Sequence, residues 1–297
     1  MSSPIAVGDA RIHRIEEWSG LFMTPQTLFA GFDAADYARV KRQIPPDYLD
    51  LERDALRACL QSFVIELGGR RILIDTGAGN DKERPGIPLF GHLNTPFLQT
   101  LASAGFTRES IDVVICTHLH VDHVGWNTML QDGAWVPTFP NAQYVFTDPD
   151  AQYWDPANRH RFPDKIGEGV NTGFFDDSVK PILERGMAQV VSGTTTLFEG
   201  LRMDPAPGHT PGSQTITIES RGQRAIFVGD IVHHPLQVFC PDWNSIFCED
   251  PGQARVTRQN VLARVAHEEA IMIPAHFAGR HVARVSRTTD GYAPQGL

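Results

Sequence analysis

Residues 117–126, with the sequence THLHVDHVGW, most constrain what this chain can fold into. The run before them, residues 111–116, is apolar and rich in β-branched side chains, which predicts a buried strand. Where that strand ends, six residues carry three imidazoles and a carboxylate: His118, His120, Asp122 and His123. Ordinary packing has no use for so many polar groups beside a core strand, because each buried polar group needs a partner.

These side chains indicate a metal site. Zinc takes histidine nitrogens and carboxylate oxygens at about 2.0 to 2.2 Å, held rigidly from different directions. Alternate residues of a strand share a face, so His118 and His120 project to the same side, and the following turn brings Asp122 and His123 around. Four such ligands are too many for one ion that keeps an open catalytic position. The stretch therefore predicts a pair of metal ions, each completed by ligands from elsewhere in the chain.

The whole chain has 297 residues, a formal net charge of −9, 41% hydrophobic residues and 21% charged residues. This composition predicts a globular protein, and the length fits one large domain, alone or with an appended lid, as well as two small ones. The acidic balance disfavours a nucleic-acid partner, because phosphates would be repelled. No apolar run is long enough to span a membrane, and the N-terminus lacks the pattern of a signal peptide. We therefore expect a cytoplasmic location and a small-molecule substrate, and a homodimer is compatible with the sequence.

Residues 19–60 are predicted to form a lid or a pocket wall. The apolar and aromatic stretches 21–25 and 28–32 are interrupted by proline and glycine, so they predict neither a continued strand nor a long helix. They could be a loop packed on the core or an apolar lid over a substrate pocket. The aromatic residues that we expect to line this pocket are Phe22, Phe29, Phe239 and Trp243.

Apolar strands and amphipathic helices alternate along the chain. The predicted strands include residues 11–17, 61–67, 70–75, 143–146, 215–219, 225–228 and 271–276, with two short strands in 189–202. The predicted helices are residues 34–43, 96–104 and 253–267, and residues 148–180 are expected to form surface loops with one or two short helices.

Further polar residues follow several of these strands. Asp75, Asp230 and His276 each come at or just after the end of an apolar strand, and His209 lies in a loop stiffened by two Pro-Gly pairs. In a layered α/β fold the strand ends converge at one edge, which is where such folds place their sites. Asp75 could simply cap a turn. Beside a metal site we favour a role in orienting a ligand histidine.

The order of these residues resembles the metallo-β-lactamase superfamily. The residues that carry the resemblance are His118-x-His120-x-Asp122-His123, Pro207-Gly208-His209-Thr210-Pro211-Gly212, Gly229-Asp230 and Pro274-Ala275-His276. The resemblance implies an α/β fold, a four-layer αββα sandwich, as a single domain over residues 1–297. It also implies that one metal is held by His118, His120 and His209. The other metal would be held by Asp122, His123 and His276, with Asp230 and a water bridging the two ions.

This implied centre predicts a hydrolase. Coordination to a metal lowers the pKa of water from about 15.7 to near 7, so a bridging hydroxide can act as nucleophile at neutral pH. The second ion can polarise the attacked carbonyl or phosphoryl oxygen. The resemblance implies two Zn²⁺ ions, although other divalent transition metals fit the same ligands. The catalytic residues that we expect are Asp122, Asp230 and His233.

Several superfamily activities fit this chain poorly. The superfamily's β-lactamases generally lack the bridging acid, here Asp230, and its flavodiiron oxygen reductases have Glu at the position of His120. A glyoxalase-II-like thioesterase would need a longer C-terminal extension than residues 277–297. Nucleases bind a polyanion, which the net charge of −9 disfavours. Small, fairly apolar esters remain, and the chain is similar to the quorum-quenching lactonases, which open acyl-homoserine lactones.

One position departs from those lactonases. They carry a tyrosine three residues after the bridging Asp, whereas this chain has His233, which is similar to the methyl parathion hydrolase-type enzymes. His233 could donate a proton to the oxyanion or leaving group, or it could be a structural histidine, as we expect for His234. We therefore place a lactonase first and an aryl-ester or organophosphate triester hydrolase second. A non-catalytic, metal-stabilised binding protein is the third hypothesis, which the complete ligand set disfavours.

Overall fold

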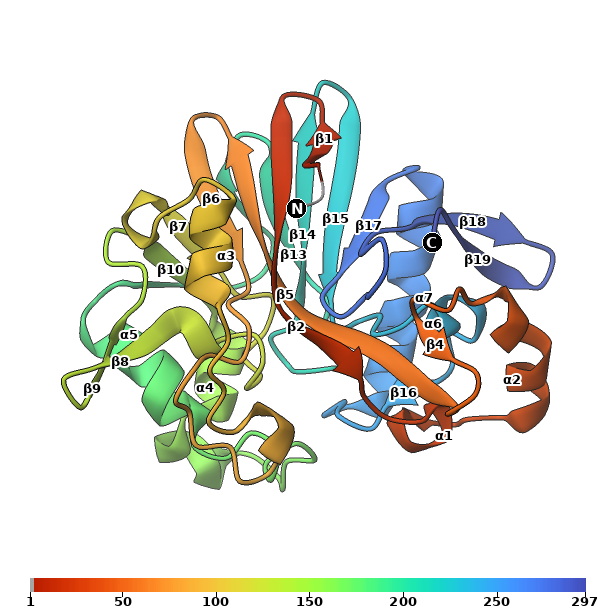
Figure 1. Cartoon of the computed structure of the whole chain (residues 1–297), viewed down its shortest axis with the longest axis horizontal. Helices are drawn as coiled ribbons and strands as arrows, with labels where there is room; N and C mark the ends of the chain where they lie inside the picture. The colour runs from red at the N-terminus through yellow and green to blue at the C-terminus, as the bar shows by residue number, and fades with distance from the viewer. Residues whose placement is uncertain (1–2) are drawn as a thin grey trace.

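Two β-sheets pack face to face in the computed structural model, which describes residues 3–297 (Figure 1). The first sheet has the order β1-β2-β5-β6-β7-β10-β11, with β4 paired to β5, and the second has the order β12-β13-β14-β15-β17. The first sheet is built from β1 (Ile5–Val7), β2 (Ala10–Leu21), β4 (Leu49–Asp50), β5 (Ala55–Leu67), β6 (Arg70–Ile74), β7 (Val113–Ile115), β10 (Gln143–Thr147) and β11 (Ala188–Val191). The second is built from β12 (Thr195–Phe198), β13 (Leu201–Pro205), β14 (Gln214–Ser220), β15 (Gln223–Gly229) and β17 (Ile271–Pro274).

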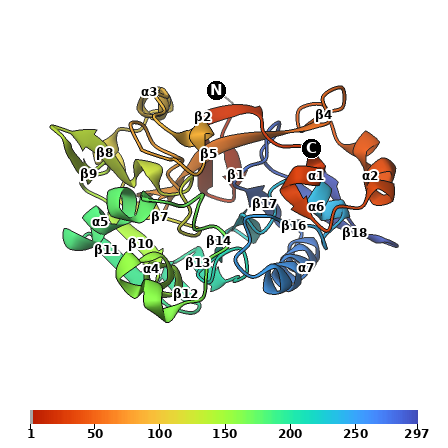
Figure 2. The ribbon, with the colours of Figure 1, turned by 90° about the horizontal axis from the view of Figure 1, so that it is seen from below.

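Helices cover the outer face of each sheet. On the first sheet, α3 (Phe97–Ser103) buries Phe97 and Leu101 in one apolar cluster with strand residues such as Val114. On the second sheet, α7 (Pro251–His267) buries Leu262 against Met272 and its neighbours. Figure 2 shows α3 and α7 on opposite sides of the sheets. The predicted four-layer αββα sandwich is therefore confirmed.

A third apolar cluster fills the space between the two sheets. It joins residues such as Ile65 and Ile74 of the first sheet to Ile216 and Phe227 of the second. Both sheets are mixed. In the first sheet β6, β7, β10 and β11 are parallel to one another, and in the second sheet β15 is parallel to β17. The other strand pairs of these sheets are antiparallel. The ends of these parallel strands define the edge at which the polar residues gather.

Two predicted strand regions differ from the structure. The strand predicted at residues 11–17 extends to Leu21, because β2 pairs with β5 from Arg11 and Glu66 as far as Leu21 and Arg57, past a register shift near Trp18. The region 189–202 was expected to hold two short strands, but it takes part in three, β11, β12 and β13. Both differences arise from pairing with distant strands, which local sequence does not reveal.

Residues 19–60 contain short elements beside the second sheet's helical layer. They include α1 (Pro25–Leu28), β3 (Phe29–Ala30), α2 (Ala34–Val40) and a 3₁₀ turn (Lys41–Gln43), so the helix predicted at 34–43 is α2 with its 3₁₀ extension. β3 pairs with β16 (Asn244–Ser245), which follows α6 (Leu236–Phe239). This pairing fixes the middle of the segment against the chain that follows Asp230.

The remaining elements are short. They are β8 (Thr128–Gln131), β9 (Ala134–Pro137), α4 (Asp148–Trp154), α5 (Lys180–Glu184), β18 (Arg284–Thr288) and β19 (Gly291–Gln295), with 3₁₀ turns at Pro88–Phe90, Arg108–Ser110, Gly125–Asn127 and Pro156–Arg161 and a π-helical turn at Phe175–Val179. Within residues 3–297, no helix combines the length and the apolar character that a membrane crossing requires.

Arg258, a fully buried arginine of α7, donates hydrogen bonds to the chain that follows Asp230. Arg258 donates from Nε to the Ile231 carbonyl at 2.8 Å, from Nη1 to the Pro241 carbonyl at 2.8 Å, and from Nη2 to Asn244 Oδ1 at 3.0 Å. Its charge is therefore spread over three acceptors that water cannot reach easily.

Replacing Arg258 by methionine should strongly destabilise the fold. The change keeps much of the side-chain volume but leaves three acceptors, two of them buried, without a donor, so we expect the free energy of unfolding to fall by about 3 kcal/mol or more. Urea denaturation of the metal-free protein measures this loss. Arg255→Met on the exposed face of α7 is the matched control, and equal stability of the two variants would contradict the role of Arg258.

Candidate metal centre

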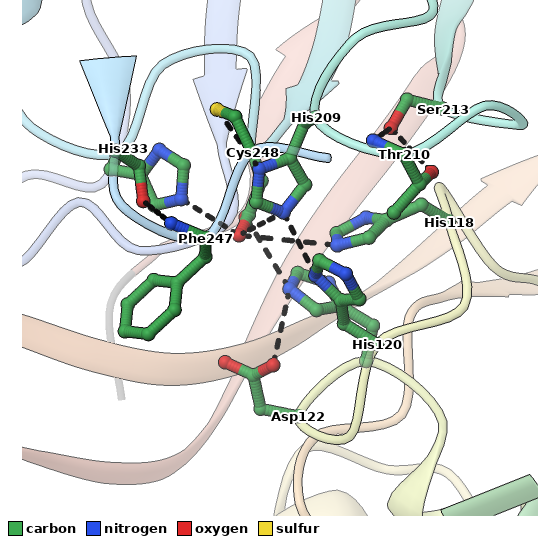
Figure 3. Close-up of polar contacts among 12 residues, drawn as sticks. His118, His120, Asp122, His209, Thr210, Ser213, His233, Phe247 and Cys248 are labelled. Carbon is green, nitrogen blue, oxygen red and sulfur yellow. Dashed lines mark hydrogen bonds and ion pairs between the residues drawn. The ribbon is translucent and has the colours of Figure 1, made fainter. Parts of the chain in front are cut away.

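Seven histidine and aspartate side chains from separate parts of the sequence meet at one edge of the sheets. The loop after β7 supplies His118, His120, Asp122 and His123, and the loops after β13, β15 and β17 supply His209, Asp230 and His276. Figure 3 shows the rings of His118, His120 and His209 turned toward one another. The structure thus brings together all of the residues that the sequence predicted as metal ligands.

These side chains divide into two triads. In the first triad, His118, His120 and His209 each offer a nitrogen within 4.8 Å of the others, and His209 Nε2 lies 2.9 Å from His120 Nδ1. The second triad is Asp122, His123 and His276, whose ligand atoms also lie within 4.8 Å of one another. The two triads are the two sets of ligands that the family resemblance implies.

Asp230 lies between the triads. Its Oδ2 faces the first triad, 3.3 Å from His209 Nε2 and 3.9 Å from His118 Nε2. Its Oδ1 faces the second triad, 3.3 Å from His123 Nε2 and 3.0 Å from His276 Nε2. One oxygen toward each triad is the arrangement that a carboxylate bridging two cations requires.

The residues fit two metal ions because their inner atoms lack partners. His118 Nε2, His123 Nε2 and Asp230 Oδ1 are buried and make no hydrogen bond to the part of the chain that the structure describes. Leaving such a group buried and unpaired costs about 1 to 3 kcal/mol, and more when the group is charged. Nitrogen and carboxylate donors at this density suit zinc and similar divalent ions, so the chemistry of the cluster is that of a two-metal site.

The outer nitrogens of most of these rings are anchored. His276 Nδ1 donates to the Cys59 carbonyl at 2.9 Å, and His123 Nδ1 donates to Asp75 Oδ2 at 3.0 Å. His118 Nδ1 lies 3.1 Å from Thr117 Oγ1, and His209 Nδ1 lies 3.6 Å from Cys248 Sγ. Such contacts fix the ring orientation and leave the inner nitrogen free for a metal.

Asp75 occupies the place expected for a residue that orients a ligand. Besides His123, it accepts hydrogen bonds from the Thr117 amide at 2.7 Å and from Thr117 Oγ1 at 2.9 Å. Its φ of 55° puts it in the left-handed region, which costs a non-glycine residue free energy and which aspartate tolerates better than most. This backbone turn lets a residue at the end of β6 reach both the start and the end of the ligand loop.

Burial and charge affect the histidine pKa values in opposite directions. Burial lowers the pKa of His118 and His120 well below the usual value and that of His209 to about 4, which keeps their nitrogens unprotonated and able to bind a metal. Burial also acts to lower the pKa of His276, but Asp230 outweighs it and raises the value to about 9. In the metal-free protein the second triad therefore holds protons that a metal must displace.

His233 points at the same centre. It is 7% exposed, its Nε2 lies 3.0 Å from Asp230 Oδ2, and neither ring nitrogen makes a hydrogen bond within residues 3–297. Its backbone amide donates to Gln237 Oε1 at 2.7 Å, which fixes the start of the side chain. The neighbouring His234 differs, because its Nε2 donates to the Tyr48 carbonyl at 2.9 Å, as expected of a structural residue.

An apolar cavity opens onto the metal centre. Phe22 lies on its wall, as the sequence predicted, together with the apolar side chains Trp18, Leu28, Leu60, Phe90, Val170 and Phe247. The structure places Phe29, Phe239 and Trp243 elsewhere. Phe29 and Trp243 are 2% and 3% exposed and contact each other in the core behind the cavity, and Phe239 packs against the same cluster. They are therefore not part of the cavity wall, because β3, α6 and the turn before β16 place them in or against the apolar cluster on the second sheet.

Sequence reasoning missed Glu17, which supports the metal site from β2. Glu17 is buried and accepts hydrogen bonds from the amides of Ala78 and Gly79 at 2.7 and 3.1 Å and from Trp126 Nε1 at 2.7 Å. It thus holds the loop after Asp75 against the chain that follows His123. Burial raises the pKa of Glu17 to about 7, although these donors act in the opposite direction.

The raised pKa of Glu17 predicts a pH-dependent contribution to stability. The neutral acid is favoured in the fold, so this contribution is complete below the unfolded value of 4.5 and is lost as the pH rises through about 7. Relative to Glu17→Gln, wild type should lose up to about 3 kcal/mol of unfolding free energy between pH 4.5 and 8. Urea denaturation of both metal-free proteins across that range checks this, and a constant difference between them would rule it out.

Asp230→Asn should reduce metal loading. The amide cannot present a negative oxygen to each triad, so one of the two cations loses its shared ligand and the repulsion between the ions is less well screened. Elemental analysis after gel filtration should find about two ions per wild-type chain and about one per variant chain. Retention of two tightly held ions by Asp230→Asn would contradict the bridge.

Sequence and structure comparisons find proteins similar to this chain among known hydrolases. Probable metallo-hydrolases of Mycobacterium tuberculosis and Mycobacterium bovis are each 24% identical over 184 residues, which cover 58% of this chain and 56% of theirs. The chain thus aligns with little more than half the length of these relatives. Among solved structures, the hydrolase AbOPH of the beta-lactamase superfamily has a TM-score of 0.82 at 24% identity, over 99% of this chain and 97% of that chain. AidC, a dizinc quorum-quenching lactonase, has a TM-score of 0.79 at 20% identity over the same shares.

The structural likenesses show a shared fold, and the sequence shows the family. Residues 61–276, which extend from β5 to the last predicted metal ligand, match the metallo-beta-lactamase superfamily. The match covers most of the chain and includes all seven residues that form the two triads and the bridge between them. The chain therefore belongs to the metallo-β-lactamase superfamily.

Proposed function

We propose that this protein is a dinuclear, zinc-dependent hydrolase of small, fairly apolar lactones or esters. One observation carries the proposal: the metal triads open directly into the apolar cavity. His120, Asp122, Asp230 and His276 all contribute to its wall. A substrate in this cavity would hold its scissile bond against the metal centre and its apolar part against the side chains opposite.

The cavity wall favours an acyl chain. Trp18, Phe22 and Phe90 belong to or pack against the cluster on the first sheet, and Leu28 and Phe247 belong to or pack against the cluster on the second, so apolar groups close the cavity from both sides. Each methylene group moved from water into such surroundings contributes about 0.8 kcal/mol. A chain of a few carbons therefore gains enough to select apolar substrates over small polar ones.

The chemistry needs no serine or cysteine nucleophile. Bound metal ions would supply a water of lowered pKa and would stabilise negative charge on the attacked oxygen. The chain itself holds the centre rigid through Asp75, Cys59 and Asp230 and surrounds it with apolar groups that limit water. His233 lies on the cavity wall and contacts only Asp230 within the described chain, so it can donate a hydrogen bond to the substrate's carbonyl oxygen or leaving group.

AidC, with a similar overall fold, is a lactonase solved with the product of lactone opening bound, which supports the lactone as the first candidate. His233 favours a second candidate, an aryl-ester or organophosphate triester hydrolase. Its imidazole stands where the lactonases described above have a tyrosine, and it lies beside Asp230 with no other partner in the described chain.

A substrate panel separates these functions. We expect the metal-loaded protein to hydrolyse acyl-homoserine lactones at least tenfold faster, in kcat/KM, than p-nitrophenyl esters or methyl paraoxon. The reverse order would favour the second candidate. Failure to hydrolyse any of them with both metals bound would favour a non-catalytic binding protein.

His233→Phe should lower turnover without removing metal. The phenyl ring fills the same space but cannot donate to a developing negative charge, so kcat should fall by about 100-fold while metal content stays at the wild-type value. Activity and elemental analysis are measured on the same sample. His267→Phe, on the exposed end of α7, is the control. Loss of a metal from His233→Phe would instead make His233 a ligand.

A further inference from the structure

A buried carboxylate connects the two loops that form the first triad. Asp150 lies in the first turn of α4 and is fully buried. Its Oδ2 accepts a hydrogen bond from the Leu119 amide at 2.8 Å and another from Thr210 Oγ1 at 2.9 Å, and its Oδ1 accepts one from the Gly212 amide at 2.6 Å. All three partners are donors, so the group acts only as an acceptor.

The partners of Asp150 adjoin the ligands of one triad. Leu119 separates His118 from His120, and Thr210 directly follows His209. Figure 3 shows Thr210 between the rings of this triad and Ser213, whose Oγ accepts a hydrogen bond from the Thr210 amide at 3.0 Å. One carboxylate therefore fixes the backbone beside all three ligands of the first triad.

The second triad depends on other contacts. Asp75 holds His123, and the Cys59 carbonyl holds His276. Within the described chain, no hydrogen bond joins Asp150 to Asp122, His123 or His276. The two triads thus have separate supports, although they share Asp230.

The contact with Gly212 is too close for any side chain at that position. A Cβ on Gly212 would lie 2.6 Å from Asp150 Cγ and 2.2 Å from Thr147 Oγ1. Thr147 Oγ1, at the end of β10, in turn donates to the Gly212 carbonyl at 2.9 Å, so the junction of β10 and α4 contacts this loop through two side chains. Position 212 therefore needs glycine, because Asp150 approaches it so closely. With glycine there, the loop that carries His209 can donate its Gly212 amide to this carboxylate.

We propose that Asp150 is a positioning residue that sets the metal affinity of the His118, His120 and His209 triad independently of the second triad. The inference rests on the two-ion centre proposed above. It adds a residue to that centre that touches neither metal nor substrate and that lies outside every motif by which the sequence revealed the site.

The hydrogen-bonding pattern predicts that asparagine cannot replace Asp150. In one orientation the amide NH₂ faces the Gly212 N–H, and in the other it faces the Leu119 N–H, so one donor always meets another donor. The loop that meets this mismatch must shift, and the nitrogens of its histidines shift with it. Removing an outer contact of a metal site typically weakens affinity by about 10- to 100-fold.

The test compares Asp150→Asn with Asp75→Asn. Each protein is loaded with Co²⁺, and the two dissociation constants are measured by competition with a chelator. Paramagnetically shifted ring N–H signals in the NMR spectrum then show which histidines each ion binds. We expect Asp150→Asn to weaken the first triad by about 10- to 100-fold and to leave the second within about threefold of wild type. Asp75→Asn should weaken the second triad more than the first.

Asp148→Asn is the matched control, because Asp148 lies in the same turn of α4 and makes its side-chain contact with Gln152 instead of a ligand loop. Equal weakening of both ions by Asp150→Asn, or no weakening, would overturn the proposal. If Asp150→Asn does not fold, Thr210→Val removes one of the three donors and should weaken the first triad alone, though less. A wild-type protein that binds fewer than two ions would instead overturn the two-ion centre.

Discussion

Burying histidine and aspartate atoms without partners costs free energy, and this constraint governs one edge of the sandwich. His118 Nε2, His123 Nε2 and Asp230 Oδ1 have no hydrogen-bond partner in the described part of the chain. Buried polar atoms in native proteins are nearly always paired, so a cluster of exceptions indicates a partner that is not part of the polypeptide. Two cations would give all of these atoms a partner. They would also explain why Asp230 lies between the two triads, which side-chain packing does not.

The surrounding structure makes that cluster rigid and accessible at the same time. Asp75, just after β6, and Asp150, in the first turn of α4, both accept hydrogen bonds from the ligand loop, and Glu17 supports the loop after Asp75. The apolar cavity opens onto the same centre. A metal centre that is held by hydrogen bonds within the protein and that opens to an apolar cavity suits the cleavage of a small substrate with a hydrophobic part.

The sequence predicted the site better than its surroundings, and the reason is physical. His118 to His123 are close in the chain and follow an apolar strand, and the other ligands follow strand ends that a layered fold must bring to one edge. Asp150 and Glu17 gave no signal, because each accepts hydrogen bonds from backbone amides that lie 31 to 62 residues away in the sequence. Phe29 and Trp243 were expected in the cavity, but the face that an aromatic side chain presents depends on the pairing of β3 with β16, which only the tertiary structure determines.

The most direct test of the central claim is a crystal structure of the zinc-loaded protein with anomalous scattering recorded at the zinc edge. The account predicts two peaks about 3.5 to 4 Å apart, one within each triad, with Asp230 between them. A single peak, or peaks that leave His209 or His276 without a metal, would contradict it.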